Sequence, residues 1–442
     1  MQIRLSDHFS YKKLIRFTLP SVIMMIFTSV YGVVDGVFVS NFVGKIPFAA
    51  INLIMPFCML FGAIGFMVGT GGSALVSKIL GEGDRARANR IFSLLVYFSI
   101  ALGTLFSVMG VVFIEPISIL LGAEGEMLSG CVMYGRILFC SLMPFVLQNV
   151  FQSFLVVAEK PKLGLAVTVA AGVTNIILDA LFIVVFKWGL VGAAAATATS
   201  QTVGGIIPLV YFFVTKKNQL KLGRTRFDGK ALLHTCANGS SEMMTNISIS
   251  LVNMLYNFQL MRMIGEDGIA AYGVIMYVNF IFISAFLGYS IGCAPIISFH
   301  YGAENTDELK NLRKKSIIII VLTSVLMTLL GMALAAPLSS VFVGYDAELN
   351  ALTQRAFILY SFSFLLVGFN IFTSAFFTAL NNGFISALVS FLRLFLFEVV
   401  AVLCLPLILG TDGVWLSVVA AEGVALILSI SCMVALHKKY RY

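Results

Sequence analysis

The stretch LGLAVTVAAGVTNIILDALFIVVF, residues 163–186, decides how this chain folds. It is almost entirely apolar and long enough for one α-helix to cross the hydrocarbon core of a bilayer. Two polar side chains interrupt it, Asn175 and Asp179, and their spacing of four places them one turn apart on the same helix face. Because a carboxylate inside a membrane helix costs roughly 3 kcal/mol or more, we expect Asp179 to have a partner or a task there.

Composition extends this interpretation to the whole chain. Hydrophobic residues make up 59% of its 442 residues and charged residues 11%, whereas soluble domains carry about 25% charged residues. The predicted fold class is therefore an all-α polytopic membrane protein. The seven cysteines form no CxxC pair and the four histidines lack ligand spacing, which argues against disulfides and zinc. The first apolar run, residues 17–39, is too long for a signal-peptide core and should remain as a membrane helix.

Apolar runs of spanning length predict twelve transmembrane helices. They cover residues 15–40, 48–77, 91–113, 128–157, 163–186, 191–214, 232–261, 270–298, 316–336, 350–379, 384–408 and 414–436. Several contain a proline or glycine, which a packed membrane helix tolerates as a bend.

Lysine and arginine predict the orientation. Loops on the side that holds both termini carry 23 of them, against three on the opposite side and three at or within helices. The positive-inside rule then places the N- and C-termini in the cytoplasm. We expect a multi-pass protein of the cell membrane, that is, the plasma or inner membrane.

The two halves of the chain repeat each other. A shift of 221 positions, without a gap, aligns Gly71 with Gly292, Gly81 with Gly302, Gly110 with Gly331, Pro116 with Pro337, Asn149 with Asn370, Ser153 with Ser374 and Gly192 with Gly413. Because each unit holds six helices, both copies start on the same side, and a pseudo-two-fold axis along the membrane normal relates them. We predict a six-helix lobe over residues 1–215, a basic cytoplasmic linker over 216–230 and a second six-helix lobe over 231–442.

Such a pair of lobes encloses a cleft that can open to either face of the membrane. The alternative, that duplication only enlarges a scaffold, leaves the buried polar residues without an explanation.

Topology places several of these polar residues at one depth. Asp35, Asp179 and Thr197 all fall in the outer half of the membrane, with Tyr31 one turn from Asp35 and Asn175 one turn from Asp179. Oxygen ligands without sulfur or imidazole suit a hard cation or a proton. The alternative is that the two acids only hydrogen-bond helices together. The fourth span adds Asn149 and Gln152, three residues apart and at lower depth.

The second half does not repeat this layer. The counterparts of Asp35, Asn175 and Asp179 are Tyr256, Leu396 and Val400. The second half instead carries Glu242, Arg393, Glu398 and Glu422 within helices. We expect Arg393 to form a structural ion pair with Glu422 or Glu398. For Glu242 two interpretations stay open: contact with a cationic substrate in the cleft, or a hydrogen-bonded structural role.

The chain resembles multidrug and toxic compound extrusion (MATE) transporters along almost its whole length. The motifs that carry this resemblance are Pro20 fifteen residues before Asp35, Tyr31 beside it, Asn149, Asn175, Asp179, Thr197, and the turn Gly81-Glu82-Gly83-Asp84. The resemblance implies that the coupling ion binds Asp35, Asn175, Asp179 and Thr197, with Tyr31 beside them. It also implies that Pro20 is a conformational hinge in the first helix. One branch of the family also uses acids in helices 7 and 10, where this chain has Glu242 and Asn370.

The preferred functional hypothesis is a secondary antiporter that exports amphipathic, often cationic, compounds in exchange for Na⁺ or H⁺. If the ion is Na⁺, the metal-binding residues are Asp35, Asn175, Asp179 and Thr197; the candidates for the substrate cleft are Asn149, Gln152, Glu242 and Asn370. We expect no other cofactor, no nucleic-acid partner and a monomer in contact with lipid. A lipid-linked oligosaccharide flippase is the alternative, and an integral-membrane enzyme is disfavoured because no catalytic pair is suitably placed.

Overall fold

The computed structural model describes residues 3–43, 45–215 and 219–442 of the chain. Within them it consists of helices and no strand, as the apolar runs predict. The elements are α1 (Tyr11–Phe42), α2 (Lys45–Gly81), α3 (Arg85–Leu120), α4 (Gly125–Cys140), α5 (Leu142–Val157), α6 (Pro161–Asp179), the π-helical turn η1 (Ala180–Val185), α7 (Gly189–Val214), α8 (Gly229–Met263), α9 (Glu266–Gly302), α10 (Thr306–Val343), α11 (Ala347–Ser361), α12 (Phe364–Ala379), α13 (Gly383–Phe391), a second π-helical turn η2 (Leu392–Phe397), α14 (Glu398–Leu409) and α15 (Thr411–Tyr440).

Most of these helices are long and apolar enough to cross a membrane. In the described part of the chain nine segments qualify by themselves, and the bent pairs α4 with α5 and α11 with α12 bring the number to eleven. The twelfth predicted span is α8, which has 35 residues but carries polar side chains such as Asn238, Ser241 and Glu242 along its length. The predicted fold class, a two-lobed all-α membrane protein, is confirmed.

Two predicted spans are broken, which the apolar runs do not reveal. The predicted spans over 128–157 and 350–379 are each present as a bent pair, in which α4 meets α5 at 53° and α11 meets α12 at 45°. At the first break Pro144 has no N–H to donate to the carbonyl of residue 140, and the Ser141 hydroxyl donates to Leu138 O (2.9 Å). At the second, the Ser363 amide bonds Tyr360 O (2.9 Å) in a tightened turn.

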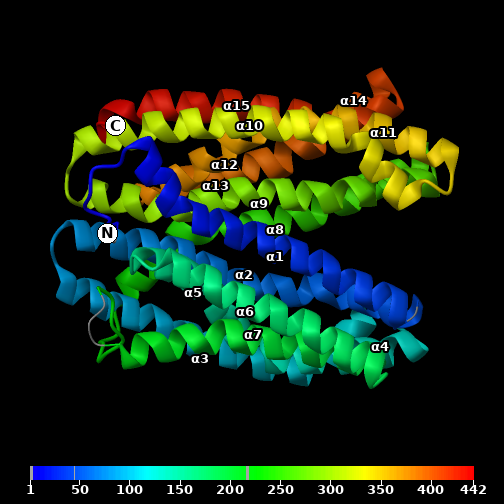
Figure 1. Cartoon of the computed structure of the whole chain (residues 1–442), viewed down its shortest axis with the longest axis horizontal. Helices are drawn as coiled ribbons and strands as arrows, with labels where there is room; N and C mark the ends of the chain where they lie inside the picture. Colours follow the sequence, from blue (N-terminus) through cyan, green and yellow to red (C-terminus); the bar gives the residue numbers. More distant parts are fainter. Residues whose placement is uncertain (1–2, 44, 216–218) are drawn as a thin grey trace.

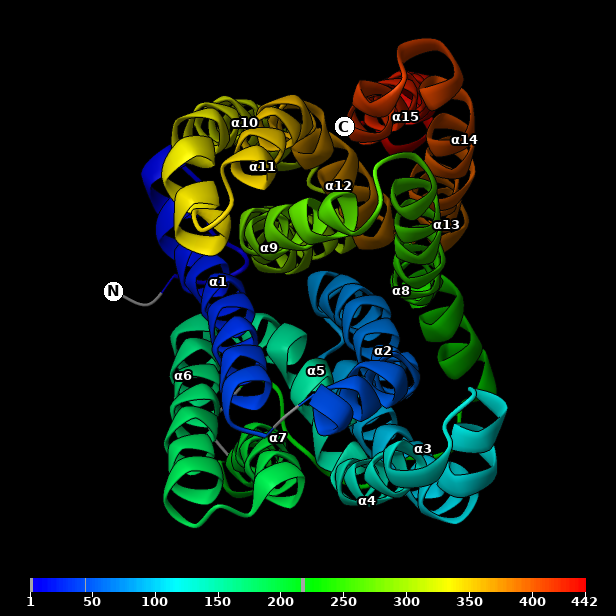
Figure 2. The same cartoon turned by 90° about the vertical axis from the view of Figure 1, so that its right-hand side faces the viewer.

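The helices form two bundles with separate apolar cores. Figure 2 shows α2–α7 on one side and α8–α15 on the other, with α1 running between them. The first core is built around Phe92, Phe151 and Phe154, and the second around Phe286, Phe364 and Trp415. This arrangement places α1 and α2 against α8 and α9 at the contact between the lobes.

The lobes touch most closely at the end of the molecule where both termini and the α2–α3 and α9–α10 connections lie, which we call the basic end (Figure 1). A Cβ atom on Gly81 would lie 2.0 Å from Phe299 O, and one on Gly239 would lie 1.9 Å from Met67 O. Only glycine permits backbones to approach this closely. Toward the opposite end the ribbons of the two bundles lie further apart (Figure 1).

Candidate cation site

The polar layer of the first lobe forms where α1, α6 and α7 converge. The carboxyl groups of Asp35 and Asp179 lie against each other, with the Asn175 amide beside them. Asp179 is the last residue of α6, and the chain continues from it directly into the π-helical turn η1. Such turns widen the backbone locally and are frequent at functional sites. The structure therefore brings together the two acids that the sequence placed at one depth.

The oxygens of this layer lack hydrogen-bond partners. Asp179 is fully buried and Asn175 is 2% exposed, while Asp35 and Thr197 are half-buried. Five buried oxygens have no partner: Asp35 Oδ1, Asn175 Oδ1, both oxygens of Asp179 and Thr197 Oγ1. Unpaired buried polar atoms are costly, at about 1–3 kcal/mol each. Four of the five can only accept, so a cation or a proton is what would satisfy them.

Neighbouring contacts fix α6 in place beneath the two acids. Gly172 lies so close to α1 that a Cβ atom there would be 2.5 Å from the Phe27 ring and 2.8 Å from the Tyr31 ring. On its other side, the Ser200 hydroxyl of α7 donates to Ala171 O (2.8 Å). These two contacts lie about two turns below Asp179. They position the acids by packing rather than by direct hydrogen bonds.

Sequence reasoning missed two residues of this region. Tyr134 on α4 is 1% exposed and lies close enough to Asp35 and Asp179 to interact with their charges. Gln148 on α5 is 6% exposed and lies beside the Tyr31 hydroxyl. Both lie in the apolar run 128–157. The feature that distinguishes them in the sequence is a side chain that can form hydrogen bonds.

The two polar candidates on α5 lie inside the first lobe. Asn149 is 3% exposed and donates from Nδ2 to Gly62 O of α2 (3.2 Å), which joins these helices. Gln152 is 6% exposed and its Oε1 has no partner among the described residues. A role for either in a substrate cleft stays a prediction.

The described part of the chain has no cluster of side chains of the kind that holds a zinc ion or another transition metal. No three His, Cys, Asp or Glu side chains there converge in a way that could hold a metal ion. The layer around Asp179 contains two carboxylates, an amide and a hydroxyl. These are ligands for a weakly held hard cation or for a proton.

Comparison with known proteins agrees with this fold. The MatE family model matches residues 20–181 and 243–403, which is one match in each half of the repeat and most of the chain. The chain belongs to the MATE family. Among its relatives is the "Multidrug export protein MepA" of Staphylococcus saprophyticus, 24% identical over 367 residues that cover 81% of this chain and 80% of that protein.

Solved MATE structures share the whole fold. "Crystal structure of MATE in complex with MaL6" superimposes with a TM-score of 0.92 at 22% identity, covering 98% of both chains. "Outward-facing conformation of a multidrug resistance MATE family transporter of the MOP superfamily" gives a TM-score of 0.91 at 23% identity and the same coverage. At these identities the superpositions show the fold, and the roles of individual residues are argued from the site.

The second lobe of this MATE protein contains a buried polar cluster of a different kind. The predicted ion pair is confirmed: Arg393 Nη1 lies 3.0 Å from Glu422 Oε1, and both side chains are at most 7% exposed. Asn370 Nδ2 donates to the other carboxylate oxygen, Glu422 Oε2 (2.7 Å), and to Glu422 O (3.0 Å). Asn370 is fully buried, so in this structure it belongs to the internal packing of α12 against α15.

The remaining acids of the second lobe surround this pair. Glu242 on α8 is half-buried and lies near the positive charge of Arg393. Glu398, at the start of α14, lies beside the Tyr256 hydroxyl, whose ring stacks on Tyr272 with centroids 5.0 Å apart. Arg393 therefore lies among several acids. The positive charge nearest to Glu242 is this arginine of η2, and not a residue of its own helix.

Pro20 lies on α1 between two sets of contacts. Near it, α1 packs against α9: a Cβ on Gly292 would lie 3.0 Å from Thr18 Cα, and one on Gly288 would lie 2.6 Å from Val22 Cα. Further along, α1 packs against α6 through Phe27. The first part of α1 is thus attached to the second lobe and the part that bears Asp35 to the first. A hinge at Pro20 stays a prediction.

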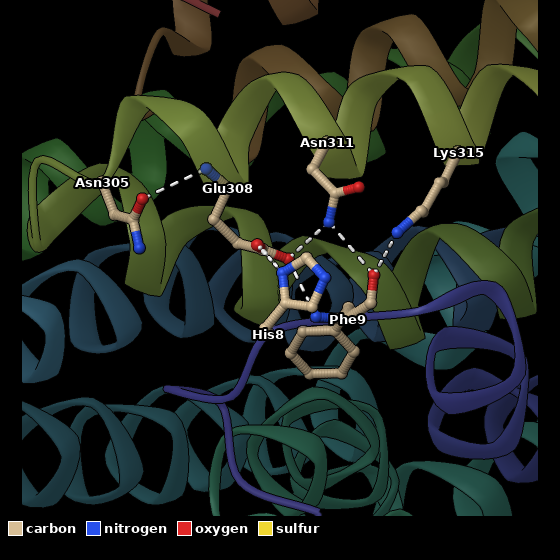
Figure 3. A network of polar contacts seen from close by, with 6 residues as sticks. All are labelled: His8, Phe9, Asn305, Glu308, Asn311 and Lys315. Carbon is tan, nitrogen blue, oxygen red and sulfur yellow. Dashed lines mark hydrogen bonds and ion pairs between the residues drawn. The ribbon is translucent and has the colours of Figure 1, made fainter.

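The segment before α1, residues 3–10, joins both lobes at the basic end. Figure 3 shows His8 and Phe9 against α10. Glu308 accepts from Phe9 N (2.9 Å) and contacts His8 Nδ1 (2.6 Å), while Asn311 Nδ2 and Lys315 Nζ donate to Phe9 O (3.0 and 2.6 Å). At its other end, Leu5 N donates to Glu159 Oε1 of the first lobe (2.8 Å). No local sequence pattern predicts these contacts, because the partners of the segment are about 150 and 300 residues away.

Proposed function

We propose that this MATE protein is a secondary antiporter that exports amphipathic, often cationic, organic compounds in exchange for Na⁺ or H⁺. The observation that carries the proposal is the set of five unpaired buried oxygens around Asp35 and Asp179. Its relative MepA is named as a multidrug export protein, which supports the substrate class.

The ion would bind by satisfying these oxygens. Two carboxylates in contact cannot both ionise cheaply in a site of low dielectric, so a proton shared between them or a cation held by both removes their repulsion. Na⁺ would take Asp35, Asn175, Asp179 and Thr197 as ligands, with the Tyr31 hydroxyl next to them. A proton would need only one of the two acids.

Exchange requires that the ion favour one arrangement of the lobes over the other. The site is built from α1, α6 and α7, and α1 is also attached to α9 of the second lobe. Neutralising the pair of acids would change the packing of α1 against α6 and, through α1, the contact between the lobes. We place the basic end in the cytoplasm, in which case the present arrangement is closed to the cytoplasm and opens outward.

The flippase alternative has less support. It requires an arginine-lined cleft, yet the guanidinium of Arg393 is 7% exposed and paired with Glu422. The basic side chains of the described residues lie mainly at the basic end, outside the apolar parts of the helices.

Transport by purified protein in proteoliposomes tests the proposal. A fluorescent organic cation serves as substrate, and Na⁺ and H⁺ gradients are imposed in turn. We expect one gradient to drive export by the wild type, and Asp35→Asn and Asp179→Asn each to abolish that coupling. Glu126→Gln, which changes an exposed acid at the start of α4, is the matched control. Gradient-driven export that survives both aspartate substitutions would overturn the site.

A further inference from the structure

A cavity at the basic end collects positive charge that the transport mechanism does not use. It has a volume of about 660 Å³ and is lined by the segment before α1, the α2–α3 and α5–α6 connections, the chain after α7 and the end of α9. Three of its lining side chains are cationic, Arg4, Arg85 and Lys160, and each comes from a different segment. One lining side chain, Glu159, is acidic.

The cations of this cavity are compensated only in part. Glu159 lies near the charges of Arg4 and Lys160, and Asp7 lies near that of Arg4, but the cavity lining holds three cations and one acid. No ion pair of Arg4, Arg85 or Lys160 occurs within residues 3–43, 45–215 and 219–442. Glu159 accepts from Leu5 N, and Asp84 accepts from Arg87 N at the start of α3. These two nearby acids are therefore engaged with backbone amides. Like charges brought together in a cavity repel one another unless an anion lies between them.

The equivalent place in the second lobe shows what the first lobe lacks. By the 221-residue repeat, Arg85 and Arg87 correspond to Thr306 and Glu308. The first turn of α10 thus carries acids, as the helix dipole favours, and Glu308 holds the segment before α1. The first turn of α3 carries no acid. At this position the first lobe has Arg85, which lines the cavity.

The cavity also offers a hydrogen-bond acceptor. Gln219 lines it, and its Oε1 is buried and has no partner in the described chain. An inorganic anion alone would leave that oxygen unpaired, whereas a phosphate ester that carries a hydroxyl group would satisfy the cations and the acceptor together.

We propose that this cavity is a binding site for a phosphate ester with a neighbouring hydroxyl group. Arg4, Arg85 and Lys160 bind the phosphate, and Gln219 accepts from the hydroxyl. Two sources share this chemistry: the headgroup of a glycerol phospholipid and a soluble phosphate monoester. Phe299 on α9 forms part of the wall, so the lining is complete only while the lobes touch at the basic end. The binding site itself does not depend on the proposed transport function.

Binding to the purified full-length chain tests this proposal without transport. Native mass spectrometry measures retention of dioleoylphosphatidylglycerol, with dioleoylphosphatidylcholine as the zwitterionic comparison that has no headgroup hydroxyl and no net charge, and calorimetry measures binding of glycerol 3-phosphate. The pocket variant is Arg85→Gln with Lys160→Gln. The control is Lys310→Gln with Lys314→Gln, which makes the same charge change at exposed positions of α10. We expect the pocket variant to bind about a hundredfold more weakly, roughly tenfold for each lost charged contact, and the control to bind as wild type.

Each outcome decides something. Loss of phosphatidylglycerol retention in the pocket variant alone supports the site and identifies the lipid headgroup as its ligand. Loss of glycerol 3-phosphate binding in that variant alone supports the site with a soluble ligand. A single Arg4→Gln change, on a separate segment, should weaken the same probe about tenfold. Equal losses in the pocket and control variants, or no binding of either probe to wild type, would overturn the proposal.

Discussion

The two lobes share one frame and differ in how they treat buried charge. In the first lobe, Asp35 and Asp179 lie together, and Asp35 Oδ1 and both oxygens of Asp179 lack partners. In the second lobe, Glu422 has both carboxylate oxygens bonded, one to Arg393 and one to Asn370. The repeat places Tyr256 and Val400 where the first lobe has its two aspartates. The paired aspartates of the first lobe therefore lack a positive charge beside them, whereas Glu422 of the second lobe has one in Arg393.

This difference assigns the lobes different parts in the proposed exchange. A site that lacks an internal counter-charge has to change when an ion or proton leaves, because its two carboxylates then repel each other. The ion pair of Arg393 and Glu422 is already neutral and can stay the same in either state. We therefore expect the second lobe to act as the fixed partner against which α1 and α6 rearrange.

The largest effect should come from breaking the neutralised cluster. Arg393→Met leaves Glu422 buried without its cation, which should cost about 3–5 kcal/mol of stability. The double change Arg393→Met with Glu422→Met removes both charges and should recover most of that loss. Thermal unfolding of the detergent-solubilised protein measures both. If the single and double variants unfold alike, the pair is not the compensated unit we describe.

The same measurement on the first lobe should give the opposite sign. Asp35→Asn removes one of two juxtaposed carboxylates, so we expect stability in the absence of a coupling ion to stay the same or to rise by about 1 kcal/mol. Thermal unfolding with and without Na⁺ at fixed pH checks this. A strong destabilisation by Asp35→Asn would mean that the acid is a hydrogen-bonding residue of the packing, which is the alternative interpretation of the sequence.

A third prediction concerns the two equivalent helix starts at the basic end. Glu308→Ala removes the acceptor that holds Phe9 N and His8, which should cost about 1–3 kcal/mol locally. Hydrogen exchange of residues 3–10 should speed up accordingly. Asp307→Ala changes the neighbouring acid, which is exposed, and should leave exchange unchanged. Equal protection in all three proteins would show that the segment is held by Leu5 and Phe9 packing instead.

The smallest effect should come from Asp7, in the same segment. Partial burial raises the pKa of Asp7, but hydrogen bonds from the Lys13 side chain and the Arg4 amide outweigh it, so that its pKa lies below the ordinary value of 3.8. A lowered pKa stabilises the segment at neutral pH, and this contribution is lost as pH falls through the pKa of the folded state. Because the Lys13 and Asp7 side chains are 33% and 29% exposed, solvent screens the pair, and Asp7→Asn should cost under about 1 kcal/mol. Exchange rates of residues 3–10 should differ between wild type and variant at pH 7 and converge once the pH falls below the pKa of Asp7 in the folded state.

Much of this architecture could be predicted from the sequence, because hydropathy and repeats are periodic signals. The spans, the duplication and the common depth of Asp35 and Asp179 follow from run lengths and loop charges. Arg393 and Glu422 could be paired because few charges lie within helices. In contrast, hydropathy does not register a break such as the one at Ser141, where the chain stays apolar through a bend. Tyr134 was missed for a similar reason, since an aromatic residue in an apolar run looks like core.

Contacts between residues that are far apart in the sequence could not be predicted. Phe9 meets Glu308 across 299 positions, and no local pattern signals that pairing. The cavity near Arg85 likewise depends on five segments that meet only in the folded chain. The basic residues themselves are visible in the sequence, but there they indicate topology and nothing more.

Infrared difference spectroscopy of the first-lobe acids tests the central claim most directly. Spectra of the purified protein are recorded on exchanging K⁺ for Na⁺ at constant pH and on lowering the pH without Na⁺, for wild type, Asp35→Asn and Asp179→Asn. The account predicts carboxyl bands that respond to one of these ions in the wild type and are lost in both variants. Bands that respond equally in all three proteins would contradict it, because the responding carboxylates would then lie outside the layer around Asp179.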